Sequence, residues 1–148
     1  MTALRLARPE DLPKLLPLVA AFHDHMGIST DEAHRTAALT PLLEGSPLGA
    51  CYLIGPRMAP IGYVVISFGW SVEFGGLDGT VDEIFLRPSV RGRGIGHEVL
   101  SELPKALAGA GLKALHLEVR ADDEPAQRFY KRLHFTPRDG YVLMTRES

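Results

Sequence analysis

Two arginines and three glycines fall within six residues of this chain, Arg91-Gly92-Arg93-Gly94-Ile95-Gly96. A short apolar run, Ile84-Phe85-Leu86, precedes them, and apolar residues at helical spacing follow them. Glycine lets a backbone approach a ligand closely and take up positive φ without a steric penalty. The free N–H groups of a first helical turn favour a bound anion, and guanidinium groups pair well with phosphate oxygens. This strand–loop–helix stretch therefore predicts a pyrophosphate-binding loop.

The spacing of the glycines decides which kind of phosphate loop this is. A nucleoside-triphosphate loop requires a lysine and a hydroxyl residue after its last glycine, and neither follows Gly96. A dinucleotide fingerprint counted from Gly92 puts His97 where the third glycine is required. The pattern that does fit is Arg-x-x-Gly-x-Gly, formed by Arg91, Gly94 and Gly96. A glycine-rich surface turn without a ligand is the alternative.

The length and composition set the class of protein. A chain of 148 residues is large enough to bury one proper core, so residues 1–148 are expected to form a single domain. A content of 45% hydrophobic and 23% charged residues is ordinary for a soluble globular protein. The net charge of −2 gives no reason to expect nucleic acid as a partner. No signal peptide or long apolar span is present, which predicts no membrane partner and a cytoplasmic location.

Hydrophobic periodicity predicts the elements that position the loop. Helices are expected from residue 9 to Met26, from about residue 29 to Leu43, from Ile95 to about Leu103 where Pro104 should kink or end the helix, and from Asp123 to about Leu133. Strands are expected at 4–7, 50–54, 61–69, 84–86, 115–119, 135–136 and 141–145, with a glycine-rich loop over 70–79.

The predicted order is β-α-α-β-β-β-α-β-α-β-β. It indicates an α/β fold of the mixed-sheet (α+β) kind, with helices on both faces of the sheet. The strand–helix–strand unit around the glycine loop should be parallel and right-handed. A ligand is expected outside the carboxyl ends of its two strands.

The chain has few residues that suggest redox or metal chemistry. Its single cysteine, Cys51, lies in an apolar run and is expected to be a buried strand thiol rather than a nucleophile. His23, His25 and His34 fall on the first two helices without a carboxylate cluster beside them. We therefore expect these histidines to be structural or solvated, and we expect no metal site.

A second pattern follows the first along the chain. Residues 123–135 read Asp-Glu-Pro-Ala-Gln-Arg-Phe-Tyr-Lys-Arg-Leu-His-Phe. This stretch resembles the N-x-x-A-x-x-F-Y-x-x-x-G-F signature of the GCN5-related N-acetyltransferase (GNAT) family, and the Arg91–Gly96 loop resembles the acyl-coenzyme A loop of the same family. The resemblance is strong over residues 60–137, and the N-terminal helices match only in general layout. It is nearest to the small-amine and polyamine-acetylating branch, which carries an acidic pair like Asp82-Glu83.

The resemblance implies a co-substrate and the residues that hold it. Acetyl-coenzyme A would lie between the strand ending at Leu86 and the strand ending at Val119. Backbone groups of Phe85 and Leu86 would bond the pantetheine and polarise the thioester. The pyrophosphate would be held by the backbone of the loop residues, and Asp123 at the next helix is also expected among the coenzyme-binding residues. These loop residues are Arg91, Gly92, Arg93, Gly94, Ile95 and Gly96.

The resemblance also implies catalytic roles. Tyr130 matches the tyrosine that protonates the departing thiolate in many members, and a phenol suits that step. A packing tyrosine is the alternative. An attacking ammonium must lose a proton, and we expect Asp82 first and then Glu83 to accept it. Strand alternation would place Asp82 on the face of Thr80 and Ile84, with Glu83 on the other face. For both Asp82 and Glu83, the alternative to a catalytic role is a structural one, as a salt-bridged carboxylate in the strand.

Acidic residues are also expected near the acceptor. Glu73 and Asp78 precede the acidic pair in sequence, and such a lining would steer a cationic amine. A solvated acidic loop is the alternative.

Two residues depart from the family pattern. Asp123 replaces the usual asparagine and brings a negative charge that a nearby pyrophosphate would repel. His134 replaces the usual glycine, and if that position requires positive φ, histidine adopts it at some cost.

The sequence therefore predicts an acetyl-coenzyme A-dependent N-acetyltransferase that acts on a small primary amine by direct attack, without an acyl-enzyme. The alternatives are a protein N-terminal acetyltransferase and a non-catalytic domain that binds acyl-coenzyme A as a sensor or docking module. Family habit also predicts a possible homodimer.

Overall fold

The computed structural model describes residues 3–148. The chain divides after Glu118 into two compact units. The first unit contains a sheet and three helices, and the second contains one helix and a long irregular tail. That the whole chain acts as one domain stays a prediction.

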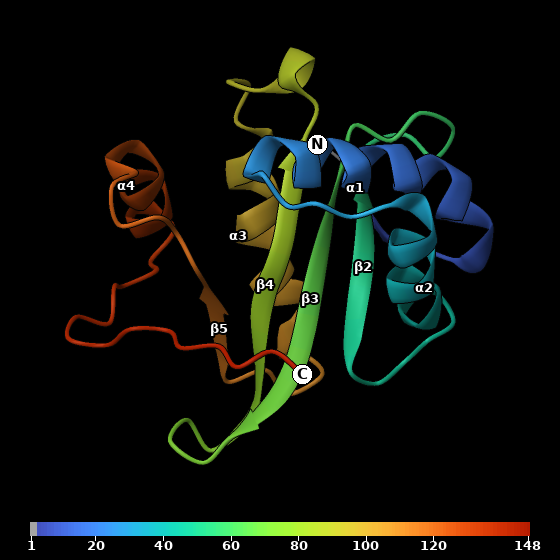
Figure 1. Cartoon of the computed structure of the whole chain (residues 1–148). Helices are drawn as coiled ribbons and strands as arrows, with labels where there is room; N and C mark the ends of the chain where they lie inside the picture. The colour runs from blue at the N-terminus through green and yellow to red at the C-terminus, as the bar shows by residue number, and fades with distance from the viewer. Residues whose placement is uncertain (1–2) are drawn as a thin grey trace. The chain divides into compact units, whose positions relative to one another are not determined.

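A five-stranded sheet forms the centre of the first unit. Its strands are β1 (Leu4–Leu6), β2 (Gly49–Ile54), β3 (Gly62–Ser71), β4 (Gly76–Leu86) and β5 (Ala114–Leu117). They lie side by side in sequence order, with antiparallel pairing from β1 to β4 and parallel pairing between β4 and β5 (Figure 1). The predicted mixed sheet, with a parallel pair around the glycine loop, is confirmed.

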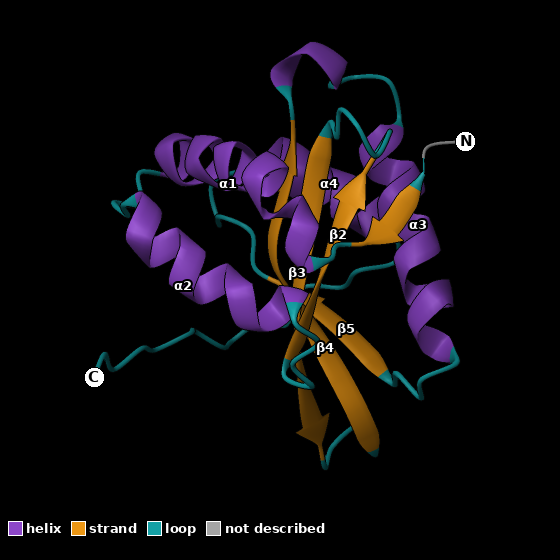
Figure 2. Cartoon of the chain, turned by 90° about the vertical axis from the view of Figure 1, so that its right-hand side faces the viewer, coloured by secondary structure: helices purple, strands orange, loops and turns teal. Residues whose placement is uncertain are grey.

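Helices cover both faces of this sheet. Helices α1 (Leu12–Met26) and α2 (Glu32–Leu43) lie on one face, and α3 (Ile95–Ala108) lies on the other (Figure 2). Apolar residues of α1 and α2 pack against inward side chains of the strands. This core comprises Ala7, Leu15, Leu18, Val19, Leu39, Leu43, Cys51, Leu53, Tyr63, Val65 and Phe85. Because each helix presents one apolar stripe, the sheet is buried on both sides.

The start of the first unit is fixed by a buried ion pair. Asp11 ends the 3₁₀ turn Pro9–Asp11 before α1, and it is 4% exposed. Its two carboxylate oxygens accept hydrogen bonds from the Arg5 guanidinium at 3.0 and 3.2 Å, and Arg8 N donates at 2.8 Å. The hydrogen bond from Arg5 is the largest cause that lowers the pKa of Asp11.

Pro104 was expected to kink or end the third helix near Leu103, and of these two alternatives the end there is wrong. Helix α3 continues through Pro104 to Ala108, with Leu103 and Leu107 buried on either side of the proline. A proline inside a helix costs about 3 kcal/mol. Each buried leucine returns roughly 1.5–3 kcal/mol, so the packing of α3 against the sheet offsets the lost backbone hydrogen bond.

The predicted loop over residues 70–79 is mostly strand. Strand β3 runs to Ser71 and β4 begins at Gly76, with Ser71 paired to Gly76 and Gly69 to Asp78. Only four residues turn the chain, and Gly75 takes a φ of 81° there. Cross-strand pairing therefore overrides the low strand propensity of the glycines, because that propensity depends strongly on context.

The predicted alternation of side chains along β4 is also wrong. The register with β3 shifts between Val65, which faces Glu83, and Ile66, which faces Val81. Asp82 is therefore the extra residue of a β-bulge. Since Val65 and Ile66 point to opposite faces, Glu83 and Val81 do too. As a result, Thr80 lies on the face of Glu83 and opposite Ile84.

The second unit contains helix α4 (Glu124–Arg132) and residues that form no strand. The predicted strands at 135–136 and 141–145 are wrong in this structure. The side chains of residues 141–144 are 71 to 87% exposed. A strand-forming sequence needs a neighbouring strand and a covered face, because an isolated hairpin is only marginally stable.

Among the helices of residues 3–148, none is both long and apolar enough to cross a membrane.

Candidate active site

The edge of β4 opens where the bulge begins. Parallel pairing with β5 covers Asp78 to Val81 of β4, and its last pair is Val81 with Leu117. Residues 82–86 continue β4 beyond that pairing, bonded to β3 on their other side. Phe85 is buried and Leu86 half-buried at the end of this segment. This segment therefore has an edge that β5 does not pair with, and the role of Phe85 and Leu86 in binding pantetheine stays a prediction.

The glycine loop after β4 has the backbone conformation expected of it. Gly92 and Gly94 take φ values of 78° and 77°, which confirms the predicted positive φ at two of the three glycines. Gly96 lies instead in the first turn of α3, whose N-cap is Gly94. A Cβ atom built on Gly92 or Gly94 would meet nothing within 4 Å. The loop thus presents open backbone at a helix start, which fits a phosphate group.

Arg91 lies against the end of β4. Its Nε donates to the Leu86 carbonyl oxygen at 2.9 Å, and its guanidinium carbon lies 5.4 Å from the centre of the Phe85 ring. Arg91 and Arg93 are both exposed. The two cations therefore lie at the surface of the loop, with Arg91 connecting it to the open strand edge.

The carboxylate of Glu83 is held on the α1 face of the sheet. Tyr63 of β3 donates its hydroxyl to Glu83 Oε1 at 2.8 Å, and His23 Nε2 of α1 lies 2.7 Å from Glu83 Oε2. The side chain of Glu83 is 17% exposed, and that of His23 is 11% exposed. Burial, followed by the charge of Glu83 and the hydrogen bond to it, raises the pKa of Tyr63. Tyr63 is therefore a neutral donor to this carboxylate.

His23 is the functional candidate that sequence reasoning missed. It was expected to be structural or solvated, and its burial and hydrogen bonds fit the structural expectation; its imidazole also joins Glu83 to the connection between α1 and α2. Its Nδ1 lies 2.7 Å from Thr30 Oγ1. One signal pointed there: His23 follows the buried residues Leu15 and Val19 by eight and four positions, so it shares their face of α1.

Asp82 lies at the bulge itself and keeps an exposed surface. Partial desolvation of the carboxyl group by the surrounding protein raises the pKa of Asp82. The charges of Glu83 and Glu118 raise this pKa further, and the charge of His23 lowers it. The two acidic neighbours are thus differently placed. Glu83 is mostly enclosed, with one hydrogen-bond partner for each carboxylate oxygen, while Asp82 is accessible at the open part of β4.

The other acidic residues do not gather with this pair. Asp78 lies further back along β4, and its Oδ2 is 3.2 Å from His116 Nε2 of β5. Glu73 belongs to the turn between β3 and β4. The hairpin spreads these carboxylates along its length, so they do not form the single lining that the sequence predicted. No three His, Cys, Asp or Glu side chains within residues 3–148 are placed to hold a metal ion.

Tyr130 and Asp123 belong to the second unit, on and before α4. Asp123 caps this helix: its Oδ1 accepts from Ala126 N at 3.1 Å. The ring of Tyr130 packs edge-on against Phe135, with centroids 6.0 Å apart. Burial raises the pKa of Tyr130, and the charge of Asp123 adds to this. His134 takes a φ of 72°, as predicted for the residue that replaces the family glycine.

Comparison with known proteins settles the family. A model of the acetyltransferase (GNAT) family matches residues 19–135, which include the glycine loop, the acidic pair and α4. The chain belongs to the GNAT family. Its sequence is 39% identical over 88 residues to an uncharacterised protein of Mycobacterium leprae and 32% identical over 73 residues to an acetyltransferase of Sodalis glossinidius. These matches cover 57% and 47% of the chain, but only 23% and 51% of the two curated relatives.

Solved structures share the fold of this GNAT chain. An integron cassette protein from a salt-marsh metagenome at Cole Harbour superposes with a TM-score of 0.83 at 30% identity, covering 97% of this chain and 89% of the other. AAC(6′)-Iy, solved with the bisubstrate analogue CoA-S-monomethyl-acetylneamine, superposes with a TM-score of 0.81 at 15% identity, covering 100% and 99%. The second likeness shows the fold alone.

The single cysteine of this GNAT chain is not placed for covalent catalysis. Cys51 lies in β2 with 1% of its surface exposed. Burial, followed by the negative charges of Glu83 and Asp11, raises the pKa of the Cys51 thiol to about 12. Because the thiolate is the reactive form, a thiol that stays protonated at neutral pH is a poor nucleophile. The prediction of a buried strand thiol is confirmed.

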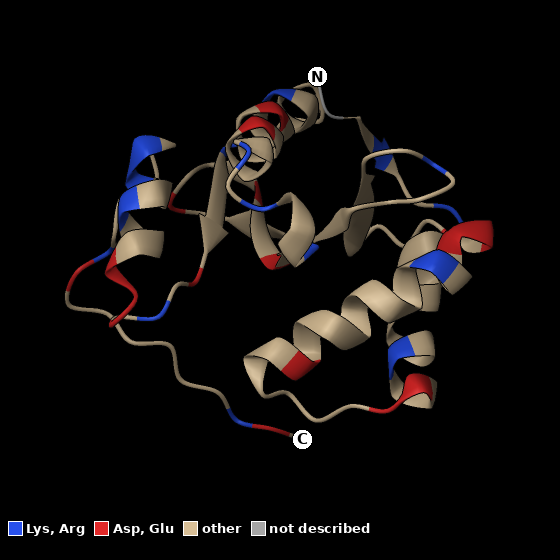
Figure 3. Cartoon of the chain, turned by 90° about the horizontal axis from the view of Figure 1, so that it is seen from above, with Lys and Arg blue, Asp and Glu red and all other residues tan. Residues whose placement is uncertain are grey.

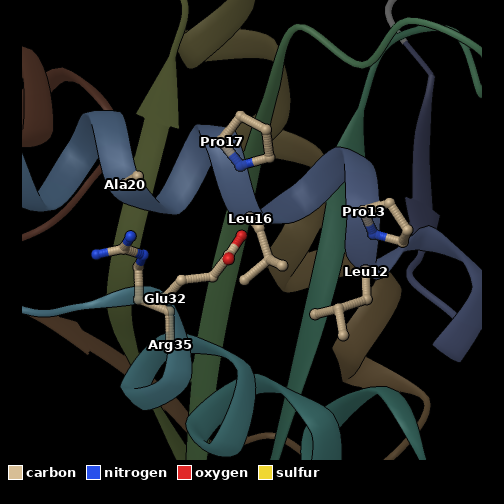
Figure 4. A pocket seen from close by; sticks show the side chains of 7 residues that line it. All are labelled: Leu12, Pro13, Leu16, Pro17, Ala20, Glu32 and Arg35. Carbon is tan, nitrogen blue, oxygen red and sulfur yellow. The ribbon is translucent and has the colours of Figure 1, made fainter.

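A pocket of about 340 Å³ lies between the two N-terminal helices of this GNAT chain. Leu12, Pro13, Leu16, Pro17 and Ala20 of α1 line one side, and Glu32 and Arg35 of α2 line the other (Figure 4). Arg35 also donates to the backbone oxygen and the Oγ1 of Thr30. Arg35 therefore belongs both to the lining of the pocket and to the series of hydrogen bonds that includes His23 and Glu83.

Proposed function

We propose that this GNAT chain is an acetyl-coenzyme A-dependent N-acetyltransferase that acetylates a primary amine by direct attack. The observation that carries the proposal is the position of the acidic pair. Asp82 and Glu83 begin the open segment of β4, and the glycine loop that fits a phosphate follows the same strand. Groups suited to deprotonate an amine and to bind a coenzyme thus belong to one continuous segment.

The chain's own groups fit the coenzyme. Open backbone at Gly92 and Gly94, the start of α3 at Ile95 and Gly96, and the exposed cations Arg91 and Arg93 would hold the pyrophosphate. The backbone of Leu86 lies on the free edge of β4 and would bond the pantetheine, with Arg91 Nε already donating to the Leu86 carbonyl, whereas the backbone of Phe85 faces β3. When bound, acetyl-coenzyme A supplies an activated acyl carbon. Coenzyme binding in AAC(6′)-Iy, through its CoA-containing analogue, supports this assignment for a chain of the same fold.

The coenzyme-binding role expected of Asp123 stays a prediction. Its carboxylate oxygen also caps α4 by accepting from Ala126 N, and so orients the helix that carries Tyr130.

The acidic pair and Tyr130 would move the protons. Asp82 or Glu83 takes the proton that the ammonium of the acceptor must lose before its nitrogen attacks. The raised pKa of Asp82 makes its carboxylate a stronger base than an ordinary aspartate. Tyr130 would deliver a proton to the departing thiolate, and its raised pKa keeps the phenol protonated until then. The unreactive thiol of Cys51 supports direct attack over a covalent route.

The decisive experiment measures free thiol released from acetyl-coenzyme A with a panel of amines, namely polyamines, aminoglycosides, amino acids and N-terminal peptides. Calorimetric titration with coenzyme A runs alongside. We expect binding, and thiol release with a small amine that is lost in the Asp82→Asn/Glu83→Gln double variant. Binding without thiol release from any amine would contradict the enzyme and favour an acyl-coenzyme A sensor. Release with peptides alone would indicate an N-terminal acetyltransferase. Gel filtration of the parent tests the proposed homodimer.

A further inference from the structure

Five side chains of the first unit form one continuous series of hydrogen bonds. It runs from Tyr63 to Glu83 at 2.8 Å, to His23 at 2.7 Å and to Thr30 at 2.7 Å. Arg35 Nη1 completes it at 3.1 Å from Thr30 Oγ1. Strands β3 and β4, helices α1 and α2, and the loop between these helices each contribute a member. The series therefore connects the proposed base to the α1–α2 pocket.

The donor at each link follows from what each group can do. Arg35 can only donate, so Thr30 Oγ1 accepts from it. The hydroxyl still has one hydrogen and one lone pair, so it donates to His23 Nδ1 or accepts from it, depending on the tautomer of His23. With Nδ1 accepting, the neutral imidazole carries its hydrogen on Nε2 and donates it to Glu83 Oε2. Tyr63 donates to the other oxygen of Glu83, so every donor then points toward this carboxylate.

The surroundings of His23 explain why the Glu83 carboxylate requires hydrogen-bond donors. Helix α1 carries no Lys, Arg, Asp or Glu between Lys14 and Asp24 (Figure 3). An ionised carboxylate under such a helix is costly unless hydrogen bonds satisfy it. His23 and Tyr63 satisfy one oxygen each. Thr30 is held in turn because α1 ends at Gly27, with a φ of 70°, and α2 begins directly after Asp31.

We propose that His23 is a positioning residue for the reaction: fixed by Thr30 as the tautomer that carries hydrogen on Nε2, it holds the carboxylate of Glu83 oriented to accept the proton of the amine. This inference rests on the proposed function, in which Glu83 belongs to the base pair. His23 acts through Glu83 and does not itself touch the substrates.

The first test reads the tautomer without any acceptor. Nitrogen NMR of the histidine-labelled protein at neutral pH should show His23 with hydrogen on Nε2 and none on Nδ1. Thr30→Val, which keeps the shape and removes the hydroxyl, should release this preference, whereas Thr30→Ser should keep it. A His23 that carries hydrogen on Nδ1, or on both nitrogens, overturns the proposal. So does a Thr30→Val protein with an unchanged spectrum.

The second test separates positioning from packing. In His23→Gln the amide nitrogen reaches roughly the place of Nε2 and can still donate to Glu83, whereas His23→Asn is too short to do so. With acetyl-coenzyme A and the best amine of the panel, we expect His23→Asn to lower kcat by about 10- to 100-fold. His23→Gln should retain most of the rate, and the KM of the amine should stay the same in both. Melting temperatures establish that both variants fold.

The outcomes also separate this inference from the proposed function. If Glu83→Gln abolishes turnover while His23→Asn and Thr30→Val leave kcat unchanged, the proposed base stands and the role of His23 is overturned. If Glu83→Gln keeps full turnover, Glu83 is not the base and this proposal fails with it, while Asp82 remains. Should His23→Asn not fold, Thr30→Val carries the kinetic test, because it removes the tautomer preference without shortening the histidine.

Discussion

The hydrogen bond between Tyr63 and Glu83 allows a quantitative test of the buried carboxylate. The Tyr63 side chain is fully buried at 0% exposure, and its hydroxyl lies 2.8 Å from Glu83 Oε1. Tyr63→Phe keeps the ring and removes only the donor. Hydrogen bonds to charged groups are worth about 1.5–3 kcal/mol. For a chain of this length that loss should lower the melting temperature by about 3–12 °C.

A double-mutant cycle then isolates the contribution of the charge. In a Glu83→Gln background the acceptor is neutral, so Tyr63→Phe should cost only about 0.5–1.5 kcal/mol. The difference between the two costs gives a coupling energy of about 1–1.5 kcal/mol between the hydroxyl and the carboxylate. Urea unfolding of the four proteins, followed by circular dichroism at pH 7, measures each free energy of unfolding. Equal m-values show that the same structure unfolds in each protein.

A coupling below about 0.5 kcal/mol would refute the reasoning, since distant, independent sites add within that margin. Tyr63 would then be a packing residue whose hydroxyl gains no stability from the charge of Glu83. Thiol release by the same proteins shows whether the loss of this donor also lowers kcat.

Four further predictions test other parts of the structure. Gly94→Glu should lose coenzyme A binding by calorimetry with a native circular dichroism spectrum, whereas Gly111→Glu, at a glycine that also has positive φ and open space, should bind normally; unchanged affinity in the first would contradict the phosphate loop. Tyr130→Phe should lower kcat by about 10²–10⁴-fold with little change in melting temperature, and a rate within a factor of about two of the parent would make water the proton donor. The pKa of Cys51 is raised from 9.0 to about 12, so as the pH rises the thiol ionises in the unfolded protein before it does in the folded one. The free energy of unfolding should therefore fall between these pH values by up to about 1.4 kcal/mol per pH unit. In urea titrations Cys51→Ala should reduce this pH dependence, and an unchanged slope would contradict the buried thiol. Because the pKa of Asp11 is lowered from 3.8, its stabilisation is present above that pH and is lost as the pH falls through the folded value; Asp11→Asn should be less stable at pH 7 and lack that acid-induced loss, and equal acid sensitivity would contradict the ion pair.

The β-bulge at Asp82 gives the two acidic neighbours, Asp82 and Glu83, different positions. The bulge at Asp82 turns Glu83 toward α1 and leaves Asp82 accessible. Two adjacent carboxylates thus receive different surroundings from a single extra residue. Bulges next to active sites often re-aim a side chain in this way.

The sequence by itself determined the features that depend on neighbouring residues. Positive φ at Gly92 and Gly94, the end of α1 at Gly27 and the N-cap of α4 at Asp123 all follow from local backbone and side-chain preferences. The family and its two motifs were readable for the same reason, since each motif is a short run of residues.

Only the tertiary structure decided the features that depend on distant partners. His23 and Glu83 are 60 residues apart, and no periodicity relates them. The bulge at Asp82 appears only when β4 is aligned with β3, and α3 continues through Pro104 because its leucines are buried against the sheet. The exposed segment 141–144 shows the converse, since a strand sequence without a paired neighbour remains irregular. Hydrogen bonds and burial between distant segments outweigh local propensity, because each contributes more free energy than a single residue's preference for helix or strand.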